Sequence, residues 1–272
     1  MKDKYCVIIG GNGVENARSP KVWNKFFKKT NISCKMYPLK VHKKNLKTTL
    51  NELLKDKNFL GGSVAIPHKE ELFKILKKNC DNQAKKIGAI NCFYKKNNKF
   101  YGENTDGQGF ELLLKDKVNK KKIKKVLILG CGGAGRSVVV HCRKFFTKKT
   151  KILVSTRNKN LNFIKKNNCS WINWKDRSKY KGDVDIIVNC TSIGFQNQSK
   201  KSPLISLKKT KNKKLLIDII YNPIKTKLLK IGAISGYQIL NGLKMNQLQA
   251  ALAIKKVIKI NYSYSKIIKY IA

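Results

Sequence analysis

The chain has 272 residues, 42% of them hydrophobic, which is enough for a large core and favours two domains. A net charge of +45 would indicate a nucleic-acid or membrane-surface ligand if the charge were clustered. The lysines instead occur in pairs and triplets scattered along the chain, among many asparagines and isoleucines. Because these three residue types share A- and T-rich codons, we interpret the charge as a composition bias. We therefore predict no specific nucleic-acid partner and no membrane partner.

Other classes of protein are also disfavoured. No N-terminal apolar segment precedes a small-residue cleavage site, and no uninterrupted apolar run reaches about 18 residues, so we expect a cytoplasmic protein. The cysteines form no Cys-x-x-Cys pair, and His42, His68 and His141 lack the spacing of metal ligands. We expect reduced cysteines and no bound metal.

The first hundred residues alternate strand and helix patterns. Apolar runs predict strands over 5–9, 34–39 and 62–66, and helices over 20–27 and 46–54. Ser19 is a natural N-cap and Pro20 a natural first helical residue. This alternation predicts a small α/β domain.

Polar groups that could carry chemistry follow the apolar stretches of this domain. Lys69 comes just after a predicted strand, where Pro67 makes the chain turn. Asn91 and Asp106 follow two later apolar stretches. A lysine beside a carboxylate can pass a proton to or from an alcohol while a nicotinamide moves the hydride. These residues therefore predict a catalytic pocket that needs a cofactor.

A glycine-rich turn supplies the cofactor signal. The apolar run over 123–129 predicts a buried strand, and residues 137–142 continue a helix that begins near Ala134. Strand, glycine turn and helix in this order are typical of a dinucleotide site, where glycines let the backbone approach the pyrophosphate and the helix N-terminus favours the anion. The predicted cofactor residues of the turn are Gly130, Cys131, Gly132, Gly133 and Ala134.

The end of the next strand, over 151–154, indicates which dinucleotide binds. A bare ribose usually meets an Asp or Glu there, whereas a 2′-phosphate is accommodated by Arg. The segment offers Arg157 and no acid, with Thr156, Asn158 and Lys159 as further donors. We therefore favour NADP over NAD.

Further strands are predicted over 184–189 and 214–218, followed by a helix from about 244 to 260 and another near the C-terminus. The fold class predicted is α/β, with an N-terminal α/β substrate domain, a Rossmann-type dinucleotide domain and C-terminal helices that return to the first domain. The predicted boundaries are 1–106 with 240–272 for the substrate domain and 107–239 for the NADP domain.

The chain resembles the shikimate dehydrogenase family from end to end. The matching strings are Gly11-Asn12 with Ser19-Pro20, Pro67-His68-Lys69-Glu70, Gly88-Ala89-Ile90-Asn91, Gly102-Glu103-Asn104-Thr105-Asp106-Gly107, Gly130-Cys131-Gly132-Gly133-Ala134, Asn189-Cys190-Thr191-Ser192-Ile193-Gly194, Asp218-Ile219-Ile220-Tyr221-Asn222-Pro223, and Gly242 with Met245, Gln249 and Ala250. Their order and spacing are highly specific.

The resemblance implies a reversible, NADP-dependent reduction of 3-dehydroshikimate to shikimate, a step of aromatic amino-acid biosynthesis. It implies Lys69 as the acid/base and Asp106 as its partner. It places Gly242 near the nicotinamide, with Ile219 packed against it, and a monomer or a homodimer would suit the family. The substrate-binding residues that it implies are Ser19, Ala65, Asn91, Asp106, Tyr221 and Gln249.

Three positions depart from the family pattern and leave alternatives open. Ala17 stands where a serine would bind the substrate carboxylate, and Ser63 and Ala65 replace an amide and a hydroxyl. One alternative is therefore a quinate/shikimate dehydrogenase with an altered substrate preference. The other is a degenerate paralogue that binds polyanions through its positive charge.

Overall fold

The computed structural model describes residues 4–157 and 161–272. The chain divides into two compact units, Met1–Gly109 with Gln247–Ala272, and Phe110–Asn246. Helices α5 (Thr105–Lys117) and α9 (Leu243–Ile258) contain the points where the chain leaves and re-enters the first unit. No helix among the described residues is long and apolar enough to cross a membrane.

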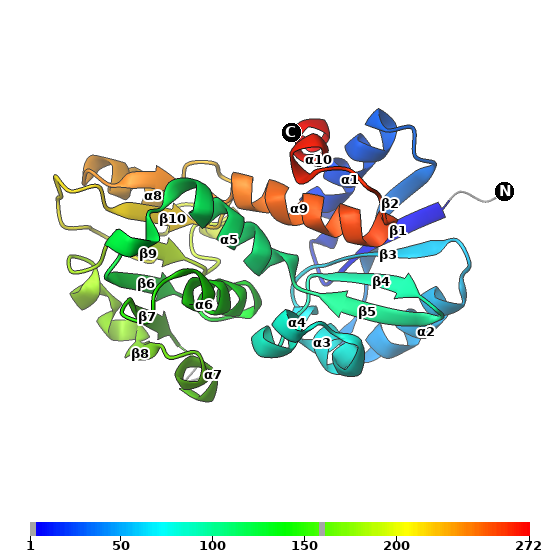
Figure 1. The fold of residues 1–272 in the computed structure, drawn as a ribbon, viewed down its shortest axis with the longest axis horizontal. Helices are drawn as coiled ribbons and strands as arrows, with labels where there is room; N and C mark the ends of the chain where they lie inside the picture. The colour runs from blue at the N-terminus through cyan, green and yellow to red at the C-terminus, as the bar shows by residue number, and fades with distance from the viewer. Residues whose placement is uncertain (1–3, 158–160) are drawn as a thin grey trace. The chain divides into compact units, whose positions relative to one another are not determined.

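The first unit is built on a mixed sheet with strand order β2-β1-β3-β4-β5 (Figure 1). Strands β1, β2 and β3 are parallel, and β4 runs antiparallel to both β3 and β5. The remaining elements of this unit, with their bounds, are β1 (Lys4–Gly10), α1 (Arg18–Lys29), β2 (Cys34–Lys40), α2 (Leu46–Lys55), β3 (Phe59–Val64), α3 (Lys69–Leu76), α4 (Asn82–Ile87), β4 (Cys92–Lys96), β5 (Lys99–Glu103) and α10 (Tyr264–Ile271).

Helices cover both faces of this sheet because its strands are apolar on both sides. Val7 and Ile9 of β1 belong to a core cluster with residues of α2 and α3, whereas Cys6 belongs to a second cluster with α1, α9 and α10. This split follows from the alternation of side chains along a strand. The C-terminal helices thus complete the core of the N-terminal unit, as predicted.

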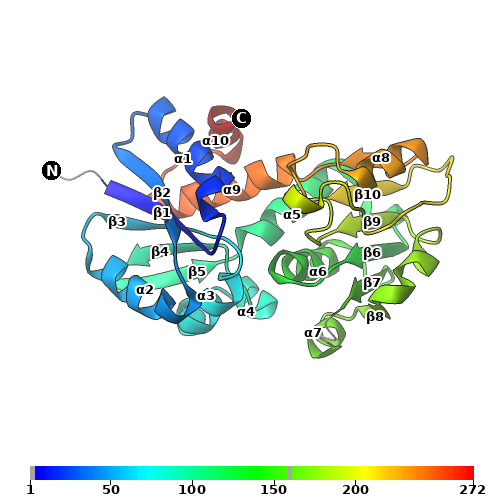
Figure 2. The ribbon, with the colours of Figure 1, turned by 180° about the vertical axis from the view of Figure 1, so that it is seen from behind.

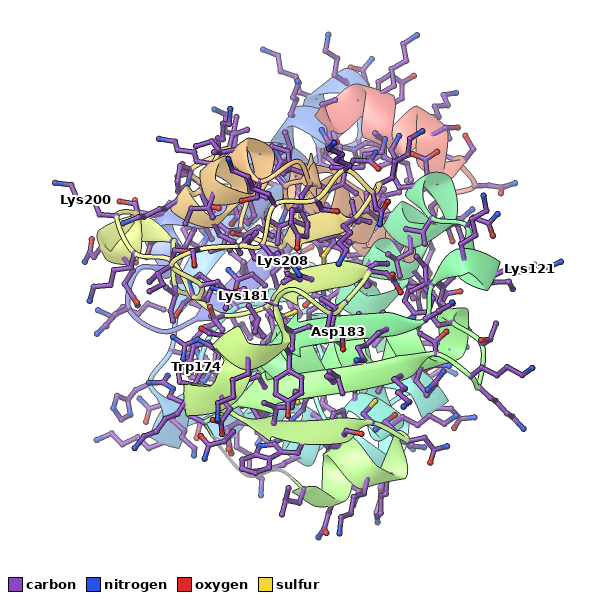
Figure 3. The ribbon with its side chains drawn as sticks, turned by 90° about the vertical axis from the view of Figure 1, so that its left-hand side faces the viewer. Lys121, Trp174, Lys181, Asp183, Lys200 and Lys208 are labelled. Atoms are coloured by element: carbon purple, nitrogen blue, oxygen red, sulfur yellow. The ribbon has the colours of Figure 1, made fainter. Side chains whose placement is uncertain are left out.

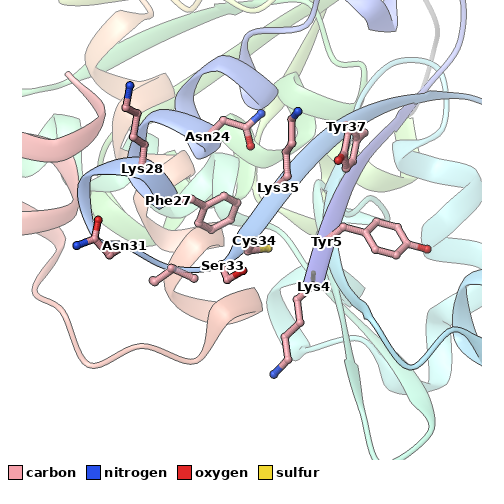
Figure 4. A pocket seen from close by; sticks show the side chains of 11 residues that line it. Lys4, Tyr5, Asn24, Phe27, Lys28, Asn31, Ser33, Cys34, Lys35 and Tyr37 are labelled. Carbon is pink, nitrogen blue, oxygen red and sulfur yellow. The ribbon is translucent and has the colours of Figure 1, made fainter. Parts of the chain in front are cut away.

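The outer edge of the sheet is protected. Asn24 of α1 donates from Nδ2 to the Met36 carbonyl at 3.0 Å and accepts from the Met36 N–H at 2.7 Å, and Pro38 has no N–H to offer. A shallow cavity of about 620 Å³ lies near this contact, at the start of β1 and β2, and is lined by Lys4, Tyr5, Asn24, Phe27, Lys28, Asn31, Ile32, Ser33, Cys34, Lys35 and Tyr37 (Figure 4). It contains none of the predicted site residues.

The second unit is a parallel sheet with strand order β11-β10-β9-β6-β7-β8 (Figure 2). Its elements besides α5 and α9 are β6 (Lys125–Leu129), α6 (Gly133–Phe145), β7 (Lys151–Thr156), α7 (Leu161–Lys166), β8 (Ser170–Asn173), β9 (Ile186–Asn189), β10 (Leu215–Asp218), α8 (Lys227–Ile234) and β11 (Gln238–Leu240). The chain passes from β6 outward to β8 and then returns to β9 on the other side of β6. This is the doubly wound topology of a Rossmann-type domain.

The predicted fold class is confirmed, but two local expectations were wrong or missing. Helix α1 begins at Arg18, so Ser19 and Pro20 lie inside its first turn and Ala17 is the N-cap. Proline fits there because the first N–H groups of a helix have no intrahelical acceptor. The β4–β5 hairpin was not predicted; it closes through Asn97 and Asn98, whose positive φ angles of 48° and 53° suit such a turn.

The positive charge is spread over the surface. In Figure 3, Lys121 and Lys200 point outward from opposite margins of the second unit. Nearby lysines use local partners: Lys125 pairs with Asp183, and Lys181 Nζ donates to Ser206 Oγ at 2.6 Å. This distribution agrees with a composition bias, and the absence of a specific nucleic-acid partner stays a prediction.

An ionic cluster around a buried carboxylate stabilises the packing of α5 on α6. Glu111 Oε2 lies 2.9 Å from His141 Nδ1 and 3.0 Å from Lys144 Nζ, and its Oε1 lies 3.2 Å from Lys115 Nζ. Burial raises the pKa of Glu111, but hydrogen bonds from Lys144, His141 and Lys115 outweigh it and lower the pKa to about 2. The ionised carboxylate therefore stabilises the folded unit.

We expect this contribution to disappear in acid. The pKa of Glu111 falls from 4.5 in the unfolded chain to about 2, so the unfolded chain binds more protons between these values and stability falls as pH falls through them. In urea unfolding, the wild type should have a higher free energy of unfolding than Glu111→Gln. This difference should shrink by about 1–2 kcal/mol as the pH falls from 4.5 to about 2, allowing for screening of the exposed lysines. A difference that stays constant with pH would contradict this.

Candidate functional site

Several predicted site residues meet at one edge of the first sheet. Strand β5 runs parallel to β3, so both strands end at the same edge, and the antiparallel strand β4 begins there. Ala65 follows β3, Asn91 precedes β4, and Asp106 lies in the first turn of α5, just after β5. Residues that follow parallel strands are the usual ligand-binding positions of an α/β sheet.

Lys69 and Asp106 form an ion pair at this edge. Lys69 begins α3, and its Nζ donates to Asp106 Oδ2 at 2.5 Å. The two side chains are 19% and 11% exposed, so the pair is mostly buried yet open to a ligand. The N-terminus of α5 favours the Asp106 carboxylate, because the helix dipole is positive there. The pair can exchange a proton with a bound group.

Asn91 connects this pair to its surroundings. Its Nδ2 lies 2.8 Å from Asp106 Oδ1 and 3.2 Å from Gln249 Oε1, and its Oδ1 accepts from the Thr105 N–H at 2.7 Å. Asn91 is only 4% exposed, and its neighbour Ile90 donates its N–H to the Lys69 carbonyl at 2.9 Å. The side chains of Lys69, Asn91, Asp106 and Gln249 thus form one connected network.

Other buried polar groups hold the segments of this network in place. His68 Nε2 lies 2.8 Å from the Val41 carbonyl, which fixes the start of α3 to the end of β2. Asn104 donates to the Ala89 carbonyl at 3.0 Å and accepts from the Gly107 N–H at 3.2 Å. Asn104 therefore caps α5 and ties it to the segment that carries Asn91.

Ser19, the remaining predicted residue of this unit, lies in the first turn of α1 and is half-buried. Ala17, the N-cap of that helix, carries no group that could cap it. The first N–H groups of α1 can therefore donate to an anion.

The second unit has its own candidate site at the ends of β6 and β9. The topology reverses between these strands, which is where dinucleotides bind in such sheets. Gly130 has a φ of +92°, and a Cβ there would lie 2.7 Å from Thr191 Cγ2, so only glycine fits. A Cβ on Gly132, the N-cap of α6, would meet no described atom within 4 Å. The space before the N-terminus of α6 is thus open to a pyrophosphate.

The predicted 2′-phosphate site follows the next strand. Thr156 ends β7 and is buried, and Arg157 comes directly after it with an exposed side chain. Asn158 and Lys159 lie outside the described residues. An exposed guanidinium at this strand end fits a 2′-phosphate.

A buried carboxylate organises the loop after β10. Asp218 accepts from Asn189 Nδ2 at 3.0 Å, from the Ile220 N–H at 3.1 Å and from Thr226 Oγ1 at 2.7 Å. Burial raises the pKa of Asp218 to about 6, although these three donors favour its ionised form. The loop that carries Ile219 is therefore tied to both β9 and α8.

Gly242 and Tyr221 also lie in this unit. A Cβ on Gly242 would lie 1.9 Å from the Ile219 carbonyl oxygen, so the two predicted nicotinamide residues are in backbone contact. The ring of Tyr221 packs edge-on against Phe195, with centroids 6.2 Å apart.

Among the described residues, no group of three or more His, Cys, Asp or Glu side chains could hold a metal ion, and the cysteines are free thiols.

Comparison with known proteins decides the family. Residues 9–93 match the model of the shikimate dehydrogenase substrate binding domain. The chain is 34% identical over 266 residues to the NADP(+) shikimate dehydrogenase of Methanococcus vannielii, covering 93% of this chain and 92% of that protein. The chain belongs to the shikimate dehydrogenase family. The corresponding enzyme of Alkaliphilus oremlandii is also 34% identical, over 90% of this chain and 88% of its own length.

Solved structures of shikimate dehydrogenases share the fold. The crystal structure of the Aquifex aeolicus shikimate dehydrogenase has a TM-score of 0.85 at 28% identity and covers 99% of this chain and 98% of its own. A shikimate dehydrogenase solved in complex with NADP+ has a TM-score of 0.84 at 29% identity, and the match covers 99% of this chain and 95% of its own. Both support the fold class predicted from the sequence.

Some residues of this shikimate dehydrogenase site carried no sequence-based role. Thr105, His68 and Asn104 lie inside the recognised strings, and the structure shows that they fix the backbone around Lys69 and Asp106. Asp218 and Asn189 do the same for the loop of Ile219. The structure buries all five of these polar residues, and buried polar groups are normally hydrogen-bonded. Their place inside the recognised strings was the available sequence signal.

We expect Gly242→Ala to weaken NADP binding at least tenfold and to lower stability by about 3 kcal/mol, because the added methyl group collides with backbone atoms of Ile219 that cannot move aside. Titration calorimetry and thermal unfolding would measure both effects. Gly132→Ala is the control: its methyl group meets no described atom, so it should keep the thermal midpoint while obstructing the pyrophosphate. Unchanged stability of Gly242→Ala would contradict the prediction.

Proposed function

We propose that this chain is an NADP-dependent shikimate dehydrogenase, which reduces 3-dehydroshikimate reversibly to shikimate in the pathway to chorismate and the aromatic amino acids. Its family membership supports the reaction, and the 2.5 Å contact between Lys69 and Asp106 is the observation that carries the mechanism. We assign 1–106 with 240–272 to substrate binding and catalysis, and 107–239 to NADP binding.

Lys69 is the proposed acid/base. Bound NADPH supplies a hydride to the carbonyl carbon of the substrate. The Lys69 ammonium donates a proton to the oxygen that becomes the hydroxyl group, and the neutral amine takes it back in the reverse direction. Asp106 orients Nζ through the ion pair and can accept a hydrogen bond from a substrate hydroxyl.

The other polar residues of this network are proposed to bind the substrate. Asn91 holds Asp106 in place, and Gln249, whose Oε1 lies near Asn91 and Thr105, can offer its Nε2 donors to a ring hydroxyl. Ser19, with the N-terminus of α1, would bind the substrate carboxylate. Tyr221 is a further proposed substrate-binding residue.

Two alanines define where this enzyme should bind its substrate less tightly. At Ala17 and Ala65 no hydroxyl is available. The hydrogen bond to the charged carboxylate lost at Ala17 costs about 1.5–3 kcal/mol of binding energy, and a neutral hydrogen bond lost at Ala65 costs about 0.5–1.5 kcal/mol. We therefore expect a weak affinity for shikimate within an unchanged reaction class.

NADP would be held by backbone and by charge. The turn of Gly130, Cys131, Gly132, Gly133 and Ala134 would bind the pyrophosphate at the N-terminus of α6. Arg157 and Thr156, with Asn158 and Lys159, would bind the 2′-phosphate, and Ile219 and Gly242 would face the nicotinamide.

The test is turnover of the purified protein with NADP and shikimate, compared with quinate and with NAD. Reduction of NADP by shikimate supports the proposal, whereas a clear preference for quinate contradicts the substrate assignment. A folded protein without turnover would contradict the reaction, and salt-sensitive nucleic-acid binding would then support the polyanion alternative. The cytoplasmic location and the monomeric or homodimeric state stay predictions.

A further inference from the structure

We propose that Lys256, through its ion pair with Glu103, is a positioning residue that sets Gln249 in register with Asn91 and Thr105. The inference rests on the proposed function, because Gln249 matters only if this network binds the substrate. Glu103 lies within the string Gly102-Glu103-Asn104-Thr105-Asp106, and its carboxylate accepts from Lys256 and Tyr94.

The ion pair is short and partly buried. Lys256 Nζ lies 2.9 Å from Glu103 Oε1, and the Tyr94 hydroxyl donates to the same oxygen at 3.0 Å. The Glu103 side chain is 7% exposed, whereas that of Lys256 is 49% exposed. Loss of the lysine would leave a buried carboxylate with one neutral donor, which is costly, so the pair constrains where α9 can lie.

The ion pair and the Gln249 contacts join the same two segments. Gln249 and Lys256 are seven residues apart on α9, about two turns, so they lie on the same face of the helix. Glu103 ends β5, and Thr105, which faces Gln249 Oε1 at 3.4 Å, follows two residues later. The Lys256–Glu103 and Gln249–Thr105 contacts therefore join α9 to the end of β5 at two separate points. Two such points fix both the rotation of α9 about its axis and its position along that axis.

The remaining packing of this part of α9 does not define the register as sharply. Its buried side chains are mostly small or aliphatic, and they belong to one core cluster with α1, α10 and the sheet residues Cys6, Met36 and Cys92. The buried residues of this part of α9 are Ala250, Ala251, Ala253, Ile254 and Val257. Apolar burial is non-directional, so it tolerates a small slide that hydrogen bonds to Gln249 would not.

Lys256 stays charged over the working range of the enzyme. Burial lowers its pKa, but the hydrogen bond and charge of Glu103, together with Asp81, outweigh burial and raise the pKa. The lysine end of the positioning contact should therefore stay charged near neutrality.

A double-variant cycle tests the inference: wild type, Lys256→Met, Gln249→Ala and the combination, each assayed for kcat and for KM of shikimate and of NADP. We expect Lys256→Met to raise the KM of shikimate about fivefold, the effect of one neutral hydrogen bond, with less than a twofold change in kcat and in the KM of NADP. In the Gln249→Ala background the same change should have no further effect, because the lysine acts through Gln249.

Control variants separate positioning from charge and from folding. Lys255→Met removes a neighbouring lysine that lies over the Tyr264 ring and should change nothing. Lys256→Arg should keep the wild-type KM. If Lys256→Met does not fold, adding Glu103→Gln removes the unpaired carboxylate, and the cycle is repeated with that pair.

The outcomes distinguish the two proposals. Equal effects of Lys256→Met in both backgrounds, or an unchanged KM in the wild-type background, would overturn the positioning role alone, with the reaction intact. A wild type that does not turn over shikimate would overturn the proposed function and the inference with it.

Discussion

Replacing Lys69 with alanine is expected to lower kcat for shikimate oxidation by about 10²–10⁴-fold, the usual contribution of a positioned acid/base. Nζ is the group that contacts Asp106 at 2.5 Å, and alanine offers nothing to accept the substrate proton. The affinity for NADP should stay within about twofold, because every proposed NADP residue lies in the other unit. Stopped-flow and steady-state measurements of NADPH formation, together with NADP titration, would check this.

Two further variants make the Lys69 result specific. Lys74→Ala removes an exposed lysine of the same helix, bound to Glu71, and should keep full activity. Asp106→Asn should lower kcat as well, since the amide keeps the shape of the carboxylate and loses its charge beside Nζ. Lys69→Ala that retains a tenth or more of the wild-type kcat would rule out the proposed acid/base role.

The site strings could be recognised from sequence because most of them place polar residues directly before or after an apolar strand. Pro67 before it and Glu70 after it distinguish Lys69 from the many other lysines of the chain. Pro67 makes the chain turn, and α3 begins at Lys69 directly after this turn. Asn91 and Asp106 were likewise predicted as site residues, and the structure joins them by a hydrogen bond of 2.8 Å. Local patterns carried this information because strand ends gather at one edge of a sheet.

What the sequence could not provide were pairings between distant segments. Lys256 and Glu103 are 153 residues apart, and in a chain with so many lysines nothing marks Lys256 as the partner of a buried acid. The predicted strand over 62–66 also missed its start: β3 runs Phe59–Val64, and Ile66 is 77% exposed. The apolar side chain of Ile66 predicts a continued strand from the sequence, whereas the tertiary fold decides whether that side chain is buried or exposed.

Replacing Arg157 with alanine is expected to raise the KM of NADP by about 10- to 150-fold, the equivalent of losing one charge-assisted hydrogen bond of about 1.5–3 kcal/mol. The KM of NAD should hardly change, because NAD lacks the 2′-phosphate that a guanidinium binds. Parallel assays with both cofactors would give the ratio of kcat/KM values directly.

The matched control for Arg157 is Lys151→Ala. Lys151 begins β7, the strand that Arg157 follows, so both changes remove one exposed positive charge from the same strand at opposite ends. If general attraction of the +45 chain for a phosphate were responsible, the two variants would weaken NADP equally. If Arg157 forks onto the 2′-phosphate, only its loss lowers the NADP preference. If Arg157→Ala keeps the wild-type preference for NADP over NAD, the selectivity belongs to Thr156 and the segment beyond Arg157. The guanidinium would then be only a solvent-exposed charge.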